Sequence, residues 1–253
     1  DNFWGPTGEE GPCGPTTEIY SQEVEIWNIV FNQYYQNKDK TLKELDIFGI
    51  DTGMGLERLA KVSQNTPTIF ETDLFLPIIK KIEELNGKKY EDYKREFRII
   101  ADHIKASVFL ISDGVLPLNV EQGYILRRLL RRVIRYGKLL KMGNNFLVPL
   151  VKKVIEIYRE IYPEIEINQE KIFSVIQNEE EKFEKTLERG LKKFNEYYEV
   201  YWNGELSERS MHGRIIFDLY QTYGFPIEMI EELAKEKGIK IYREDFEMEL
   251  KKH

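Results

Sequence analysis

Apolar residues at helical spacing govern most of this chain. From Phe97 almost to the C-terminal end they recur at intervals of three, four or seven residues, the spacing of one face of an α-helix. Helices are therefore predicted over residues 97–112, 123–141, 147–162, 169–201 and 226–234. A short extended segment is predicted at 214–220. So much helical periodicity excludes an all-β fold.

The first part of the chain follows a different pattern. Residues 5–15 hold four glycines and three prolines, which predicts a rigid loop rather than a helix. Residues 18–35 alternate β-branched and aromatic side chains with polar ones, so we expect a strand or hairpin there, with another strand at 47–51. An amphipathic helix is predicted over 69–85.

The two patterns meet near residues 86–96, which gives the simplest division of the chain. We expect an α+β protein, in which residues 1–90 form the β-containing part and residues 91–253 form a mostly helical domain. With 253 residues and 42% hydrophobic content, the chain is large enough for a substantial core and is not a disordered protein.

The average composition argues against several classes of protein. Lys and Arg number 37 against 44 Asp and Glu, and a net charge of −7 is unusual for a nucleic-acid binder. Cys13 is the single cysteine, which excludes an internal disulfide and a Cys-cluster zinc site and suits a reducing cytoplasm. Every apolar run is far shorter than the roughly 18 residues of a membrane span, so we expect a cytoplasmic protein without a membrane partner.

One predicted helix reverses the average charge. Along 123–141 the face opposite the apolar one carries Arg127, Arg128, Arg131, Arg132, Arg135, Lys138 and Lys141. Residues 98–141 hold nine Lys and Arg against three acids, so this stretch carries +6 and the rest of the chain −13. Such a helix either pairs with acids of neighbouring helices or contacts RNA phosphates. Its own pattern leaves both interpretations open.

A carboxylate, two glycines and an arginine stand together in residues 51–58, Asp-Thr-Gly-Met-Gly-Leu-Glu-Arg. The pattern predicts a strand that ends at Asp51 and a helix over 53–62. Glycines let the backbone approach a ligand, and the N–H groups at a helix start favour anions. Arg58 is then a candidate to neutralise a phosphate and Asp51 a candidate to hold a cation or an ammonium group. A Gly-x-Gly turn is also common without any ligand.

The whole string resembles motif 3 of the class II aminoacyl-tRNA synthetases, and six further strings resemble the alanyl-tRNA synthetase family. They are residues 2–4 Asn-Phe-Trp, 11–15 Gly-Pro-Cys-Gly-Pro, 25–31 Glu-Ile-Trp-Asn-Ile-Val-Phe, 99–104 Ile-Ile-Ala-Asp-His-Ile, 123–128 Gly-Tyr-Ile-Leu-Arg-Arg and 219–226 Leu-Tyr-Gln-Thr-Tyr-Gly-Phe-Pro. They occur in the family's order over nearly the whole chain. The resemblance implies an internal fragment: the end of an antiparallel-sheet catalytic domain followed by a helical tRNA-recognition domain.

An alanine–tRNA ligase is the activity that the resemblance implies. The family activates alanine with ATP and Mg²⁺ to alanyl-adenylate and transfers the alanyl group to tRNA(Ala). Arg58 matches the arginine expected at the ATP γ-phosphate, where a guanidinium fork suits phosphate oxygens. Gly53 and Gly55 match the ATP-binding glycines beside it. Asp51 matches the carboxylate for the α-ammonium of alanine.

The amino-acid pocket of the family implies further residues. Trp4, Asn28, Val30 and Gly53 match positions around bound alanine, with Val30 shaping a slot for one methyl group. Such a slot rejects glycine and serine poorly. The family therefore has a separate editing domain, and the zinc motif of that domain is absent from these residues, so no metal ligand is expected here.

Specificity in this family rests on a G·U wobble pair in the tRNA acceptor stem, read by an Asn and an Asp. Asn119 matches the first residue. Gln221 stands where the family has Asp, and because Gln is longer and uncharged, the contact could be kept, weakened or moved. Asp218 lies three residues away, and the role is not transferred to it. The resemblance also favours a tRNA-backbone role for Arg127, Arg128, Arg131, Arg132 and Arg135.

Two expectations concern the protein as a whole. Motifs 1 and 2 of the class II fold lie upstream in this family, so the 253 residues by themselves are expected not to activate alanine. A competing hypothesis is a synthetase paralogue that acts as a non-catalytic RNA-binding or scaffold protein. The intact Asp51, Gly53, Gly55 and Arg58 argue against it, because an inactive site has no reason to keep them together.

Overall fold

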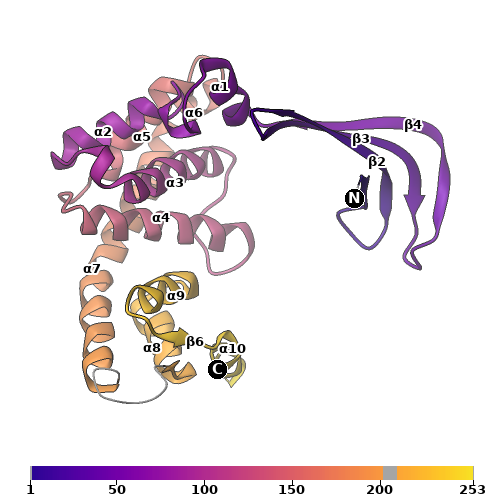
Figure 1. Ribbon diagram of the computed structural model, residues 1–253. Helices are drawn as coiled ribbons and strands as arrows, with labels where there is room; N and C mark the ends of the chain where they lie inside the picture. Colours follow the sequence, from indigo (N-terminus) through magenta and orange to yellow (C-terminus); the bar gives the residue numbers. More distant parts are fainter. Residues whose placement is uncertain (1, 202–209, 253) are drawn as a thin grey trace. The chain divides into compact units, whose positions relative to one another are not determined.

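The computed structural model of the chain describes residues 2–201 and 210–252 (Figure 1). Its contacts divide it into two compact units, Asp1–Leu76 and Pro77–His253. This boundary lies earlier than residue 90, where the change of sequence pattern places it. A four-stranded sheet lies in the first unit and the long helices lie in the second, so the expected α+β class is confirmed.

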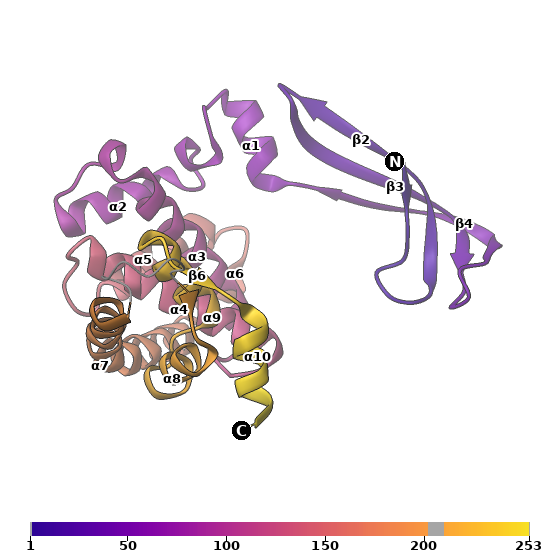
Figure 2. The same ribbon diagram turned by 60° about the horizontal axis from the view of Figure 1, so that its bottom comes forward.

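The first unit is built on an antiparallel sheet whose strands follow each other in sequence order (Figure 2). The strands are β1 (Phe3–Trp4), β2 (Gly11–Ser21), β3 (Val24–Gln36) and β4 (Leu42–Met54). β2 and β3 form the hairpin that the alternation predicts. Its two turn residues, Gln22 and Glu23, have φ of 50° and 63°, and positive φ at both positions matches the twist of the flanking strands.

The prediction of a loop throughout 5–15 is wrong for its second half, because β2 begins at Gly11. Gly14 gives the physical reason, since a Cβ at this position would collide with the carbonyl oxygen of Phe31 on β3. The glycine therefore lets two strands approach closely. A register shift between Cys13 and Thr16 accommodates the proline between them.

The strand-to-helix turn of the motif lies three residues later than predicted. β4 runs past Asp51 to Met54, and α1 (Leu56–Gln64) begins after Gly55. The N–H of Gly55 donates to the carbonyl oxygen of Ile26 at 3.1 Å, so the backbone is still held to β3 at this point. Gly53 therefore belongs to the strand and not to the helix.

The helix predicted over 69–85 is interrupted. A 3₁₀ turn, η1 (Ile69–Glu71), is closed by a reciprocal capping box between Thr68 and Glu71, and α2 (Leu76–Asn86) begins after it. Thr72 ends this turn with an extended backbone, φ −74° and ψ 164°, so the helix does not continue directly into α2. Ile78, Ile79 and Ile82 of α2 are buried, as the amphipathic pattern predicts.

The second unit is mainly helical. Its elements after α2 are η2 (Tyr90–Asp92), α3 (Lys94–Ser112), α4 (Glu121–Leu139), α5 (Leu147–Tyr158), α6 (Pro163–Ile167), α7 (Gln169–Tyr201), β5 (Ser210–Met211), α8 (Gly213–Tyr223), α9 (Ile227–Glu236), β6 (Lys240–Ile241) and α10 (Arg243–Lys252). α3 and α4 lie side by side, and α5 and α7 pack against them (Figures 1 and 2). The core between α3 and α4 includes the fully buried Ile100, Ile104, Leu126 and Leu130.

The prediction of an extended segment at 214–220 is wrong, because these residues form most of α8. Ile215, Ile216 and Phe217 make a short apolar run, and such a run fits a strand and a buried helix equally well. Ile216 and Leu219, three residues apart, are both fully buried, which is the helical spacing. Within the part of the chain that the structure describes, no helix combines the length and apolarity needed to cross a bilayer.

Candidate active-site face and nucleic-acid pocket

Four of the predicted site residues occupy one face of the sheet in the first unit. The register places Asn28 opposite Gly53 and Val30 opposite Asp51 across β3 and β4. Directly opposed residues of antiparallel strands present their side chains on the same face, so a carboxylate, an amide and a valine lie beside a bare glycine. A Cβ built on Gly53 meets nothing within 4 Å, which leaves open space next to Asp51.

Two residues that sequence reasoning missed complete this face from β2. Thr16 lies opposite Val30 and Glu18 opposite Asn28. Asn28 Nδ2 donates to Thr16 Oγ1 at 3.2 Å and to Glu18 Oε1 at 3.5 Å, so the amide is oriented by the neighbouring strand. The signal was present in the sequence as two polar residues at strand spacing, but the register could not be read from one strand alone.

Trp4 is the predicted alanine-site residue that the structure does not bring to these four. It lies on β1 opposite Gly14 and is separated from β3 by the whole of β2. Its side chain is partly exposed.

Arg58 is the third residue of α1, in its first turn, beside the end of the sheet. Its Nη1 donates to the backbone carbonyl of Glu25 at 3.0 Å and to the carboxylate of the same residue at 3.3 Å. The Arg58 side chain is 52% exposed, so this ion pair is weak and a phosphate could replace it. A Cβ at Gly55 would lie 3.2 Å from Arg58 Cδ, so the missing side chain of Gly55 makes room for the arginine.

In the second unit, Asn119 and Gln221 line the same cavity of about 310 Å³. Asn119 lies in the connection before α4, and Gln221 lies in the last turn of α8. The other lining residues are Tyr124, Arg127, Arg131, Tyr220, Gly224 and Pro226. The fold thus brings together the two positions at which the sequence predicts base recognition, although they are about a hundred residues apart.

Asp218 is already engaged elsewhere. Its two carboxylate oxygens accept hydrogen bonds from Tyr197 Oη at 3.0 Å and Thr222 Oγ1 at 2.7 Å. Asp218 lines a second cavity, which Gln221 also borders, and not the cavity that Asn119 lines. The structure therefore gives no reason to move the role of Gln221 to this carboxylate.

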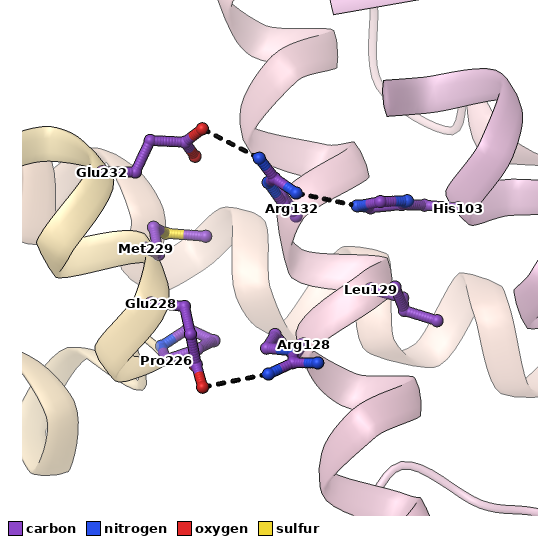
Figure 3. Close-up of a pocket in the computed structure, with 8 residues that line it drawn as sticks. All are labelled: His103, Arg128, Leu129, Arg132, Pro226, Glu228, Met229 and Glu232. Atoms are coloured by element: carbon purple, nitrogen blue, oxygen red, sulfur yellow. Dashed lines mark hydrogen bonds and ion pairs between the residues drawn. The ribbon is translucent and has the colours of Figure 1, made fainter. Parts of the chain in front are cut away.

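The arginines of α4 face acidic side chains of α9, two of which Figure 3 shows, and of α7. Arg128 pairs with Glu228 at 3.0 Å and Arg132 with Glu232 at 3.0 Å. Glu228 and Glu232 lie one helical turn apart on α9, so they match the spacing of the two arginines.

Two further arginines are more deeply placed. Arg135 Nη1 lies 2.9 Å from Glu232 and its Nη2 lies 2.7 Å from Glu236, and its side chain is 6% exposed. Arg131 Nε lies 2.7 Å from Glu179 of α7, and burial lowers the pKa of its guanidinium despite the opposing effect of that carboxylate. Pairing with neighbouring acids, one of the two interpretations of this helix, accounts for both residues. Arg128 and Arg132, each about one-third exposed, retain surface that could meet a phosphate.

His103 belongs to the same network. Its Nδ1 lies 2.8 Å from Asp102 Oδ2, and its Nε2 lies 3.2 Å from Nη1 of Arg132 (Figure 3). Because an arginine donates only, Nε2 is the acceptor and Nδ1 carries the proton toward Asp102. The imidazole thus joins α3 to α4. Across the described ranges, 2–201 and 210–252, no group of three or more His, Cys, Asp or Glu could hold a metal ion.

Comparison with known proteins gives the family. The model of the family described as tRNA synthetases class II (A) matches residues 1–253. An alanine–tRNA ligase of Borreliella afzelii (strain PKo) is 45% identical over 275 aligned residues, which cover 100% of this chain and 46% of that protein.

Two other relatives carry the same name. The alanine–tRNA ligase of Bacillus pumilus (strain SAFR-032) is 41% identical over 99% of this chain and 31% of its own length. That of Staphylococcus aureus (strain JH9) is 42% identical over 98% of this chain and 31% of its own length. The chain therefore spans less than half the length of these relatives. With the family model matching from end to end, the chain belongs to the class II tRNA synthetases of the alanyl-tRNA synthetase family.

Proposed function

We propose that the natural protein containing this chain is an alanine–tRNA ligase. It activates alanine with ATP, giving alanyl-adenylate and pyrophosphate, and transfers the alanyl group to tRNA(Ala). The observation that carries the first step is the shared sheet face of Asn28, Val30, Asp51 and Gly53. It offers a carboxylate and an amide for the ends of a small amino acid, with a valine between them.

The roles in activation follow from these groups. The Asp51 carboxylate holds the α-ammonium of alanine, so that the substrate carboxylate can attack the α-phosphorus of ATP as the bond to pyrophosphate breaks. Arg58 exchanges its exposed contact with Glu25 for the γ-phosphate and stabilises the charge on the leaving pyrophosphate. ATP brings Mg²⁺, to which we assign no residue of this chain.

The cavity of the second unit supports a role in tRNA recognition. Asn119 and Gln221 each carry an amide, which can donate to and accept from base edges, and they line one cavity. We propose that they read the G·U pair of the acceptor stem. Arg128 and Arg132 supply sequence-independent contacts to its phosphates, which position the RNA but do not specify it.

The two units have different roles in the proposed ligase. The sheet unit belongs to the catalytic domain, and the helical unit is the tRNA-recognition domain. A cytoplasmic location fits the single, buried Cys13. The 253 residues by themselves do not activate alanine, because the activating site needs the other class II motifs.

Alanine-dependent exchange of pyrophosphate into ATP by the full natural protein tests this function. Asp51→Asn should raise the KM for alanine, and Arg58→Lys should lower kcat/KM by roughly 10²-fold or more, because a bidentate phosphate contact is lost. Asp46→Asn, an exposed carboxylate of the same strand, is the matched control and should leave the exchange unchanged.

The same assay separates the competing hypothesis. A paralogue that acts as an RNA-binding or scaffold protein would bind the tRNA acceptor stem with no exchange by the wild-type protein. Exchange that is lost in the two variants and kept in the control supports the ligase. Exchange that persists unchanged in Asp51→Asn and Arg58→Lys contradicts the assigned roles.

A further inference from the structure

We propose that Arg127 is a positioning residue that fixes the amide of Asn119 with its NH₂ group toward the cavity. This inference rests on the proposed role of Asn119 in tRNA recognition. It gives Arg127 a task other than contact with a phosphate.

The guanidinium of Arg127 donates two hydrogen bonds to one short segment, residues 117–119. Its Nη1 donates to Oδ1 of Asn119, and its Nη2 donates to the carbonyl oxygen of Pro117 at 2.9 Å. The two donors belong to one planar fork of fixed geometry. The side chain of Asn119 and the backbone two residues before it are therefore held as a unit.

The rear of the guanidinium is seated against α7. Arg127 Nε lies 3.6 Å from Oε1 of Glu179, whose side chain is 5% exposed. The same oxygen accepts a hydrogen bond from Arg131 Nε at 2.7 Å. Swinging Arg127 outward to an RNA phosphate would strip a buried carboxylate of one of its two cations, which is costly in a medium of low dielectric constant.

The loop before α4 also contacts the first turn of that helix through its own backbone. The N–H of Leu118 donates to the carbonyl oxygen of Gly123 at 3.0 Å. A Cβ at Gly123 would lie 2.6 Å from the carbonyl oxygen of Leu116, so the loop lies directly on the first turn of the helix. The hydrogen bond from Arg127 adds a hold on the side-chain amide of Asn119.

The orientation of the amide decides what it can read. A carboxamide has one acceptor oxygen and one donor NH₂ group, and guanidinium groups donate only. Turning the amide over would point its NH₂ at the donors of Arg127. Asn119 therefore presents N–H groups to the cavity and recognises an acceptor on a base edge, while the amide of Gln221 supplies the acceptor for a donor on that edge.

The test is aminoacylation of acceptor-stem minihelices by the full natural protein, with either a G·U or a G·C pair at the recognised position. The measured quantity is the ratio of kcat/KM for the two substrates. Arg127→Met should lower this ratio, within the roughly 5- to 150-fold range of one specific contact, and Arg127→Lys should keep part of it. Lys138→Met, on the same helix but paired with Glu188, should leave it unchanged.

Asn119→Asp tests the orientation without changing Arg127. The aspartate keeps an oxygen for the guanidinium but has no donor. It should therefore lower the G·U to G·C ratio of kcat/KM as much as Asn119→Ala does. A wild-type ratio in Arg127→Met together with a lost ratio in Asn119→Ala overturns the positioning role and leaves the proposed function standing. A wild-type ratio in Asn119→Asp overturns the donor assignment. A wild-type ratio in Asn119→Ala contradicts the proposed recognition itself.

Discussion

Asn119 and Gln221 line one cavity although about a hundred residues of the helical unit separate them in the sequence. Arginines one turn apart on α4 hold the two segments that carry them. Arg127 donates to Asn119 itself, and Arg131 donates to the carbonyl oxygen of Gly224, just beyond the helix that carries Gln221. Recognition residues from distant parts of the sequence are thus fixed against one helix.

Gln221 should tolerate replacement by the residue usual in its family. Gln221→Asp keeps an acceptor at the cavity, so we expect the preference for a G·U over a G·C minihelix to persist. Gln221→Leu removes both donor and acceptor and should reduce the preference by about 1–3 kcal/mol. The ratios of kcat/KM from aminoacylation by the full protein check this. A leucine variant as selective as the wild type would remove Gln221 from the recognition site.

The salt dependence of RNA binding should separate the exposed arginines from the buried one. Each phosphate contact contributes about one unit to the slope of log K against log salt. Arg128→Gln and Arg132→Gln should each reduce the slope by about one. Arg135→Gln should leave it unchanged, because this side chain is 6% exposed and paired with two glutamates. Slopes from fluorescence anisotropy of a labelled minihelix test the distinction, and equal effects at all three positions would contradict it.

Glu232 should be a major contributor to the stability of the helical unit. Its carboxylate accepts from Arg95 at 2.6 Å, Arg132 at 3.0 Å, Arg135 at 2.9 Å and Tyr136 Oη at 2.6 Å. Its side chain is 12% exposed. Glu232→Gln leaves several cations under-compensated, so unfolding in urea should require about 3 kcal/mol less.

The contribution of Glu232 to stability should disappear in acid. Burial would raise its pKa, but hydrogen bonds from Arg132 and Tyr136 lower it below the ordinary 4.5. The contribution to stability is therefore present above pH 4.5 and is lost as the pH falls through the lower, folded-state value.

Glu188→Gln is the control for the unfolding measurement on Glu232→Gln. It removes an exposed pair with Lys138 and should change stability by less than about 1 kcal/mol. Similar losses at the two glutamates would contradict the network.

Glu180 should make the protein less stable as the pH rises. Burial, with the nearby charge of Glu184, raises its pKa from 4.5 to about 7, against the opposing effect of the backbone N–H groups that begin α5. The folded state therefore holds a proton that the unfolded state has lost, so stability falls between pH 4.5 and about 7 and then levels off. Glu180→Gln should remove a fall of about 1–3 kcal/mol, measured by urea unfolding at pH 5 and pH 8. Glu170→Gln changes an exposed position of α7 and should keep the decrease in unfolding free energy between pH 5 and pH 8. A decrease in Glu180→Gln as large as in the wild type would refute the role of Glu180.

The sequence predicts elements best where periodicity is long. The helix at 169–201 is confirmed to the residue, and the alternation over 18–35 is confirmed as part of the hairpin of β2 and β3. Short segments fail where local chemistry competes, as in α8, whose apolar run fits both a strand and a buried helix. The helical pattern over 69–85 is likewise interrupted at Thr72, where the backbone is extended.

The sequence could identify individual site residues but not which of them lie together in space. Motif resemblance picks out Asn119 and Gln221 one by one, but it carries no information on the cavity that they share. Thr16 and Glu18 escaped notice because the register of three strands, and not any local pattern, puts them beside Asn28. The charge pattern of α4 was correct, yet its meaning depended on acids in α7 and α9, which fold against it from far along the chain.

A double-mutant cycle on the cavity tests the central claim most directly. The full natural protein is compared as wild type, Asn119→Ala, Gln221→Leu and the double variant, in charging G·U and G·C minihelices with alanine. We predict that the wild type prefers G·U, that each single variant loses preference, and that the double variant loses less than the sum, because both residues read one base pair. Equal charging of the two minihelices by the wild type, or strictly additive losses, would contradict a shared recognition site.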